Sequence, residues 1–203
     1  MEIEEFLKEV RQCRFCRTDP TNRTPFVYSS ADPGILVVSE MPPLSAWKAN
    51  IGRYWEERDL FARRTKGAPH KLCEWLEIER NKAKDMFFWI QRANCAVTIG
   101  KSFAFQHCSS KFLDRAIDLI KPKLILVLGR VAAEYFFQFT ERVKSMMGQI
   151  ISYRGYDCIV LYHPSPAAGK WQHKPEQEKS IKLARRKINE VWQNTYGTVT
   201  DIG

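Results

Sequence analysis

Apolar residues along this chain follow two alternating patterns. Short continuous apolar runs, at residues 35–38 and 124–128, are typical of strands that are buried on both faces of a parallel sheet. Between such runs, apolar residues recur at three- and four-residue spacing, as at residues 3–13, which predicts amphipathic helices. Strands that alternate with helices favour an α/β fold, a three-layer α/β/α domain with a largely parallel central sheet.

Glycine and proline mark where the expected elements stop. The turn at Gly67-Ala68-Pro69 separates two expected helices between residues 55 and 82, and Lys121-Pro122-Lys123 ends another helix. With 203 residues, the chain fits a single domain. In chain order we expect a helix at 3–13, a strand at 35–38, the two helices, a strand at 86–90, a helix at 108–120, a strand at 124–129, a helix at 130–139, a hairpin of 150–153 and 158–162, and a helix at 175–192.

Three of the expected strands run into polar or proline-fixed loops. The strand that ends at Tyr162 leads into His163-Pro164-Ser165-Pro166, the strand at 35–38 leads into Glu40-Met41-Pro42-Pro43, and the strand at 86–90 leads into Gln91. Open α/β sheets bind ligands at the carboxyl ends of their strands, so these loops form a candidate site. The alternative is a surface loop in which His163 only caps a neighbour.

The charge balance indicates what kind of partner to expect. Lys and Arg number 32 against 23 Asp and Glu, which gives a formal net charge of +9 and favours a polyanion such as nucleic acid. The first residues are acidic, unlike a signal peptide, and no apolar run approaches the roughly twenty residues of a membrane span. We therefore expect a soluble cytoplasmic protein with no membrane partner.

Cysteine spacing adds a candidate metal centre. In a reducing compartment cysteines are better explained as ligands or catalysts than as disulfides, and one tight CxxC pair with two distant thiols suits an iron-sulfur cluster, zinc or unliganded thiols equally. Cys73 and Cys158 stand in apolar segments and are expected to be small core residues. The four candidate metal ligands are Cys13, Cys16, Cys95 and Cys108.

The ordered set of motifs resembles the family 4 uracil-DNA glycosylases, the iron-sulfur branch of their superfamily. In that family a helix ending in CxxC precedes a GEAPG-like loop, a GRPF segment, a strand ending ITNxxKC, a further cysteine, an RPKxIxxLG strand and an HP loop. The segments of this chain that match are Cys13 to Cys16, Ser39 to Pro43, Gly52 to Trp55, Ile90 to Cys95, Cys108, Lys121 to Gly129, and His163-Pro164. The resemblance implies a uracil-DNA glycosylase-like fold, a four-iron four-sulfur cluster on the four cysteines, and excision of a base from DNA.

The resemblance also implies roles for individual residues. His163 would donate a hydrogen bond to the carbonyl oxygen of the departing base, and Trp55 would stack on that base where the family has Phe. Gln91 stands where the family has its uracil-reading Asn and can also offer an amide donor and acceptor. Glu40 would position water or line the pocket, or is simply a loop carboxylate. Met41 is the remaining base-binding candidate.

Arg53, Ser165 and Lys170 are the candidate DNA-binding residues, although Lys170 also fits a solvated surface. The expected partner is DNA that contains a damaged base, bound by a monomer without an organic cofactor.

The chain departs from the family pattern in its chemistry: Gln91 replaces Asn, and Met41 stands where other branches place a water-activating Asp or Asn. Residues 44–51 also lack the acidic run of the family.

Two functions therefore remain in view. The first is a monofunctional DNA glycosylase that flips and excises uracil or another deaminated base and so initiates base excision repair. The alternative is a catalytically weak relative that binds damaged or single-stranded DNA without excision, as Met41 and the missing acidic run suggest. A zinc or redox protein unrelated to DNA would leave the matched loops unexplained.

Overall fold

The computed structural model describes residues 2–16, 25–30, 32–42, 67–97, 100–137, 143–164 and 174–197. Within these residues the chain forms one sheet of six strands in the order β1-β3-β2-β4-β6-β5. The four central strands are parallel, and an antiparallel strand borders them on each side. The strands are β1 (Tyr28–Ser29), β2 (Ile35–Ser39), β3 (Phe87–Gln91), β4 (Leu124–Leu128), β5 (Ile151–Tyr153) and β6 (Tyr156–Leu161).

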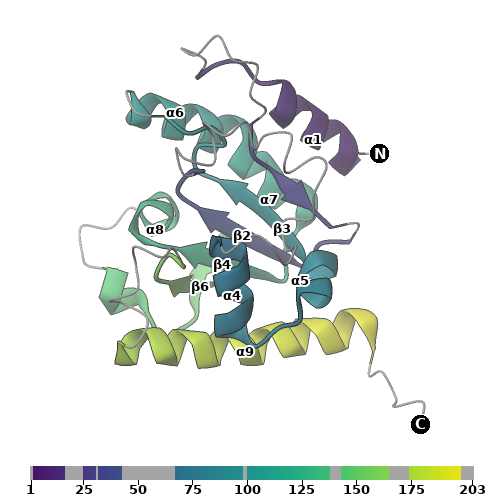
Figure 1. The fold of residues 1–203 in the computed structure, drawn as a ribbon, viewed down its shortest axis with the longest axis vertical. Coiled ribbons are helices and arrows are strands. Elements are labelled where there is room, and N and C mark those ends of the chain that lie inside the picture. The colour runs from purple at the N-terminus through teal and green to yellow at the C-terminus, as the bar shows by residue number, and fades with distance from the viewer. Residues whose placement is uncertain are drawn as a thin grey trace.

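Helices cover both faces of this sheet (Figure 1). One face carries α1 (Glu2–Gln12), α6 (Lys101–Cys108), the π turn η1 (Ser109–Leu113), α7 (Asp114–Ile120) and α8 (Arg130–Phe137). The other carries α4 (Ala68–Leu76), α5 (Arg80–Met86) and α9 (Pro175–Tyr196). A short 3-10 helix, η2 (Val143–Met146), precedes β5. The three-layer α/β/α architecture expected from the sequence is confirmed.

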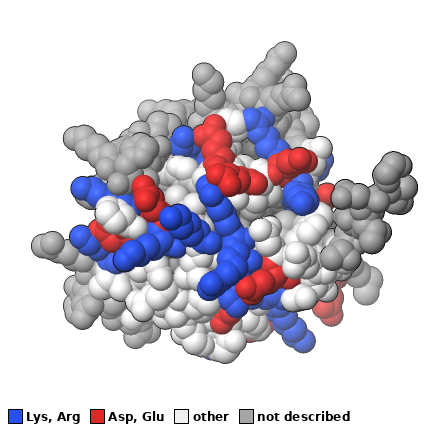
Figure 2. Space-filling view, turned by 90° about the horizontal axis from the view of Figure 1, so that it is seen from below, with Lys and Arg blue, Asp and Glu red and all other residues white. Residues whose placement is uncertain are grey.

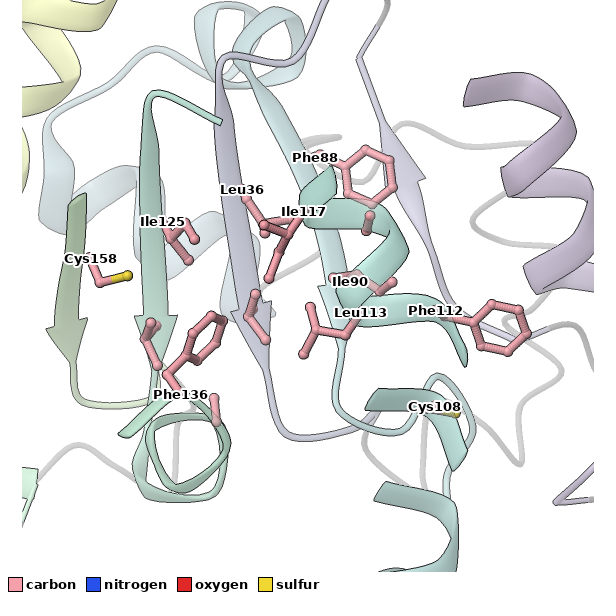
Figure 3. Packing of buried hydrophobic residues seen from close by; sticks show 14 of the residues in the cluster. Leu36, Phe88, Ile90, Cys108, Phe112, Leu113, Ile117, Ile125, Phe136 and Cys158 are labelled. Carbon is pink, nitrogen blue, oxygen red and sulfur yellow. The ribbon is translucent and has the colours of Figure 1, made fainter. Parts of the chain in front are cut away.

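The central strands are apolar throughout because both of their faces are buried. Along β2, Leu36 packs toward the face of α7 whereas Val37 packs toward the face of α9, and each is fully buried. Figure 3 shows the first of these two cores, in which Ile117 of α7 and Phe136 of α8 lie over the strands. Two fully packed faces hold the strand ends in fixed register.

Cys73 and Cys158 lie in these cores. They are the two cysteines that were not selected as candidate metal ligands, and the other four, Cys13, Cys16, Cys95 and Cys108, are called the quartet below. Cys158 sits in β6 with no exposed surface, and Cys73 on α4 is 3% exposed. Burial is the main cause that raises the pKa of the Cys158 thiol to about 12. Both residues are small core side chains, as expected.

Local chemistry sets the ends of several helices. Gly67 caps the start of α4, and Pro69 stands in its first turn, where a missing amide hydrogen costs nothing. At the end of α4, Glu77 adopts a left-handed conformation with φ of 52°, so the helix does not continue toward residue 82 as the sequence pattern suggested. The chain instead starts a separate helix, α5, at Arg80.

Other boundaries also differ from the expectation. Met86 ends α5, so the strand predicted at 86–90 begins one residue later, at Phe87. The helix expected from Cys108 already starts at Lys101. Its first turns were not predicted, because exposed Phe103 interrupts the apolar period there. Strand β1 has only two residues and was not predicted.

The outer face of α9 carries several exposed basic side chains, among them Lys179, Lys182 and Arg186. Figure 2 shows Lys and Arg gathered on this side of the molecule, with Asp and Glu between them. Lys187 lies 3.4 Å from Asp157, and Arg186 lies 3.9 Å from Glu190. Exposed pairs of this kind contribute about 1 kcal/mol or less to stability. No helix in the described ranges has the length and apolar character that a membrane crossing requires.

Candidate active site at the carboxyl ends of the strands

The carboxyl ends of the four parallel strands form one continuous edge. Register pairs Ser39 with Gln91, and Leu128 with Leu161, across neighbouring strands. His163 follows two residues after the end of β6. With strands roughly 4.8 Å apart, the ends of β3 and β6 lie about 14 Å from each other. Gln91 and His163 therefore stand at the two sides of this edge, with the ends of β2 and β4 between them.

His163 lies close to the backbone that leaves β4. Gly129, with φ of +85°, donates its amide hydrogen to the carbonyl of Leu161 at 2.8 Å, and a Cβ placed on Gly129 would lie 3.1 Å from the Cβ of His163. Burial lowers the pKa of the His163 imidazole below its ordinary value. The ring is therefore neutral at physiological pH, and a neutral imidazole donates one hydrogen bond without a charge.

The segment that carries His163 is anchored from α9. The side-chain oxygen of Gln177, a fully buried residue, accepts a hydrogen bond of 2.8 Å from the backbone amide of Tyr162. This bond fixes the backbone one residue before His163. Gln177 was not predicted from the sequence, because a single polar residue on the inner side of a long helix forms no recognisable pattern.

Gln91 is the buried amide of the site. Its side chain is 7% exposed, and its Oε1 atom is buried without a hydrogen-bond partner among the described residues. Its backbone amide donates to the Asn94 side-chain oxygen at 3.0 Å, which holds the loop after β3. An unpaired buried acceptor costs about 1–3 kcal/mol, so a ligand with a donor at this position gains a strong bond.

Ser39 lies beside Gln91 and was not selected from the sequence. The indole N–H of Trp89 donates to its hydroxyl oxygen at 3.0 Å, and Ser39 is 1% exposed. Because the indole occupies a lone pair of this oxygen, the hydroxyl hydrogen is directed elsewhere and can serve as a donor. Ser39 and Gln91 together offer one donor and one acceptor side by side, at the ends of β2 and β3.

Glu40 and Met41 follow Ser39 and are partly exposed. The carbonyl of Glu40 accepts a hydrogen bond from Ala93 at 3.0 Å, which ties the loop after β2 to the loop after β3. Next to them, Arg92 donates to the Val131 carbonyl at 2.6 Å and lies over the Phe105 ring. Burial lowers the pKa of Arg92, and nearby acids, including Glu40, partly offset that effect. Arg92 therefore braces the Gln91 loop against α8 and α6.

The structure thus brings Glu40, Met41, Gln91 and His163 to one edge of the sheet. The other predicted site residues lie outside the described residues; they are Arg53, Trp55, Ser165 and Lys170. Their roles stay predictions.

The four predicted ligand cysteines come together from three segments. Hydrogen bonds from the Cys108 and Cys95 thiols lower the pKa of Cys16 to about 3. The same contacts with Cys16 raise the pKa of Cys95 and Cys108 above the usual range, and Cys13 adds to both effects. Cys13 also lies 3.7 Å from His107, measured from Sγ to Nε2. All six cysteines lie in the described ranges, and none of them forms a disulfide.

This donor set fits a thiolate-ligated cluster. Four thiols gathered from distant segments, none in a disulfide, are the ligands that iron-sulfur clusters use. Across the described ranges, no three Cys, His, Asp or Glu side chains already stand in the geometry of a bound ion; these thiols contact one another instead. The Asn94 backbone amide also donates to Cys108, so the quartet adjoins the loop that Asn94 closes on Gln91.

The fold and the site define an open α/β protein whose candidate site residues gather at the carboxyl edge of its sheet. A sequence model of the Uracil DNA glycosylase superfamily matches residues 26–188, which include β1 to β6 and the start of the helix that anchors His163. The chain belongs to the uracil-DNA glycosylase superfamily, whose members are generally DNA glycosylases and act on DNA.

Proposed function

We propose that this protein is a monofunctional DNA glycosylase that excises uracil or another deaminated base from DNA. The observation that carries the proposal is the pairing, on one sheet edge, of a buried amide with an unpaired acceptor at Gln91 and a neutral imidazole at His163. A base must leave the helical stack to reach such an edge, as base-excision enzymes require.

In this proposal each group has a role. Gln91 Oε1 accepts a hydrogen bond from a ring N–H, and the Ser39 hydroxyl donates to the neighbouring carbonyl oxygen. Deamination converts an exocyclic amine and an unprotonated ring nitrogen into this carbonyl and N–H pair, so the edge matches a deaminated base. His163 donates to a carbonyl oxygen on which negative charge develops as the glycosidic bond breaks.

The four cysteines belong to the same proposal. They would hold a four-iron four-sulfur cluster, as in the family 4 branch, and the cluster would supply architecture, since base hydrolysis transfers no electrons. The position of Cys108 beside the Asn94 loop supports this role, because Asn94 also binds the backbone amide of Gln91.

A panel of labelled oligonucleotides tests the activity. The strands carry uracil, hypoxanthine or xanthine, single- or double-stranded, and alkaline treatment reveals abasic sites. We expect cleavage at one or more deaminated bases and none in the undamaged strand. Tight binding to the damaged strands without cleavage would instead assign the alternative, a relative that binds DNA without excision, which Met41 at the water-activating position favours.

Gly129→Ala is expected to slow excision through His163. The substitution strains a backbone with φ of +85°, which costs about 1–2 kcal/mol, and it places a methyl group 3.1 Å from the Cβ of His163. The neighbour must move by a few tenths of an ångström, so the donor leaves its position. Single-turnover excision should fall at least tenfold, as misplacement of catalytic groups causes.

Gly155→Ala is the matched control. Gly155 has the same φ of +85° in the turn between β5 and β6, but a Cβ there meets nothing within 4 Å. Urea unfolding should show a similar stability loss for both variants. Equal excision rates in the two variants would show that the contact with His163 has no catalytic consequence.

A further inference from the structure

Helix α6 presents aromatic surface to solvent. Phe103 is 71% exposed, and His107 lies one turn further along the same side of the helix. The ring of Phe15 stacks on His107, with centroids 3.7 Å apart and an angle of 2° between the planes. Phe15 is itself 56% exposed. We name these three residues, Phe15, Phe103 and His107, the aromatic platform.

Cations border the aromatic platform. Lys111 follows His107 by another helical turn, and the Arg14 side chain donates to the backbone carbonyls of Arg11 and Cys13, next to Phe15. Glu9 pairs with Lys111 at 3.5 Å and also binds Arg115 at 2.6 Å. One carboxylate shared by two cations leaves the border of the platform positive.

The helix that carries Phe103 and His107 also contacts the loop of the candidate active site. The Arg92 guanidinium, directly after Gln91, lies 4.8 Å from the centre of the Phe105 ring, within α6. Figure 1 shows α1 and α6 at the same end of the molecule, and the Phe15 stack joins the segment after α1 to α6. A strand that delivers a base to Gln91 therefore passes close to this helix.

We propose that the aromatic platform binds single-stranded DNA next to the extruded nucleotide. Bases stack on Phe103 and Phe15, and Arg14 and Lys111 contact the phosphates. Aromatic rings among cations suit single-stranded nucleic acid, because every base offers a stacking face. The positive border favours a polyanion, which carries phosphates along its whole length, over a protein partner. The inference rests on the proposed function, because it places DNA at the Gln91 edge.

Phe103→Ala tests the platform. The probe is a fluorescein-labelled oligothymidine with no damaged base, so excision does not enter, and anisotropy gives the Kd at fixed salt. We expect Phe103→Ala to raise the Kd about five- to thirty-fold, the effect of one lost base stack, and Phe103→Trp to keep wild-type affinity. Ile150→Ala is the matched control, since Ile150 is also an exposed apolar residue, 38% exposed, but lies before β5. Its Kd should not change.

The outcomes separate the two proposals. Equal Kd values for wild type and Phe103→Ala overturn the platform, whatever the excision panel shows. Weakened binding in Phe103→Ala supports the platform even if the panel detects no excision. A wild-type dimer in sedimentation that Phe103→Ala dissociates would assign the surface to a second copy of the chain and overturn the DNA proposal. Absence of DNA binding by the wild type would refute both.

Discussion

His163→Ala will lower the single-turnover rate of base excision about a hundred- to a thousand-fold. Removal of one preorganised donor to a developing oxyanion typically costs that factor, on the order of 3–4 kcal/mol. His163 is held in place for this role by the hydrogen bond from the Tyr162 amide to Gln177 and by its close approach to Gly129. Rates are measured at saturating enzyme on the best substrate of the panel, so that binding does not limit them.

Glu40→Ala is the comparison variant for this prediction. Its carbonyl, which binds Ala93, is unchanged by the substitution, so the loop keeps its backbone tie. We expect a smaller loss than for His163→Ala. If Glu40→Ala is inactive while His163→Ala keeps a near-normal rate, Glu40 positions the attacking water and the two roles are reversed.

The pH dependence of the wild-type rate follows from the same assignment. Burial lowers the pKa of His163, so the neutral donor persists from high pH down to below the ordinary histidine value of about 6.5. The His163 contribution to the rate should therefore be level above that value and decline only in acid. The unfolded chain binds the proton more tightly, so protonation of His163 also lowers stability as pH falls.

Loss of one quartet cysteine will remove the cluster and destabilise the fold. The purified protein should be brown and contain iron, whereas Cys95→Ala should lack both the visible absorbance and the iron. A ligand whose free concentration is a thousand times its Kd raises the free energy of unfolding by about 4 kcal/mol. For a chain of this size that corresponds to about 8–16 °C in Tm. Anaerobic preparation, iron analysis and calorimetry measure these effects.

Cys73→Ala provides the matched control. Cys73 is 3% exposed, like Cys108, but belongs to the core beneath α4, away from the quartet. This variant should keep its iron and lose about 1 kcal/mol of stability, as a small truncation in the core does. Stoichiometric zinc without iron in the anaerobic wild type would contradict the cluster assignment.

The sequence predicts most elements here because the strongest pattern belongs to the most buried segments. Residues 35–39 and 124–128 are buried on both faces, so their continuous apolar runs indicate strands without ambiguity. The start of α6 was missed because Phe103 faces solvent, so the expected period is absent. The end of α4 was missed because Glu77 adopts a left-handed conformation that no sequence pattern announces.

The residues of the candidate site were also predicted where the signal is local and missed where it is not. His163 and Gln91 were predicted because each stands where an apolar run becomes polar, which is a local property. Ser39 was not, because its importance depends on Trp89 in the neighbouring strand, fifty positions along the chain. Gln177 was missed for a similar reason, since its partner Tyr162 is set by how α9 packs on the sheet. Register and helix placement are tertiary properties.

Release of the free base from a strand that remains intact is the most direct test of the central claim. Mass spectrometry of the oligonucleotide after incubation with the wild type should show loss of the deaminated base and gain of water, with no break in the backbone before alkali. The His163→Ala variant should show the same product at a rate lower by the factor given above. An unchanged oligonucleotide mass at saturating wild-type enzyme, on every substrate of the panel, would contradict the claim that this protein is a DNA glycosylase.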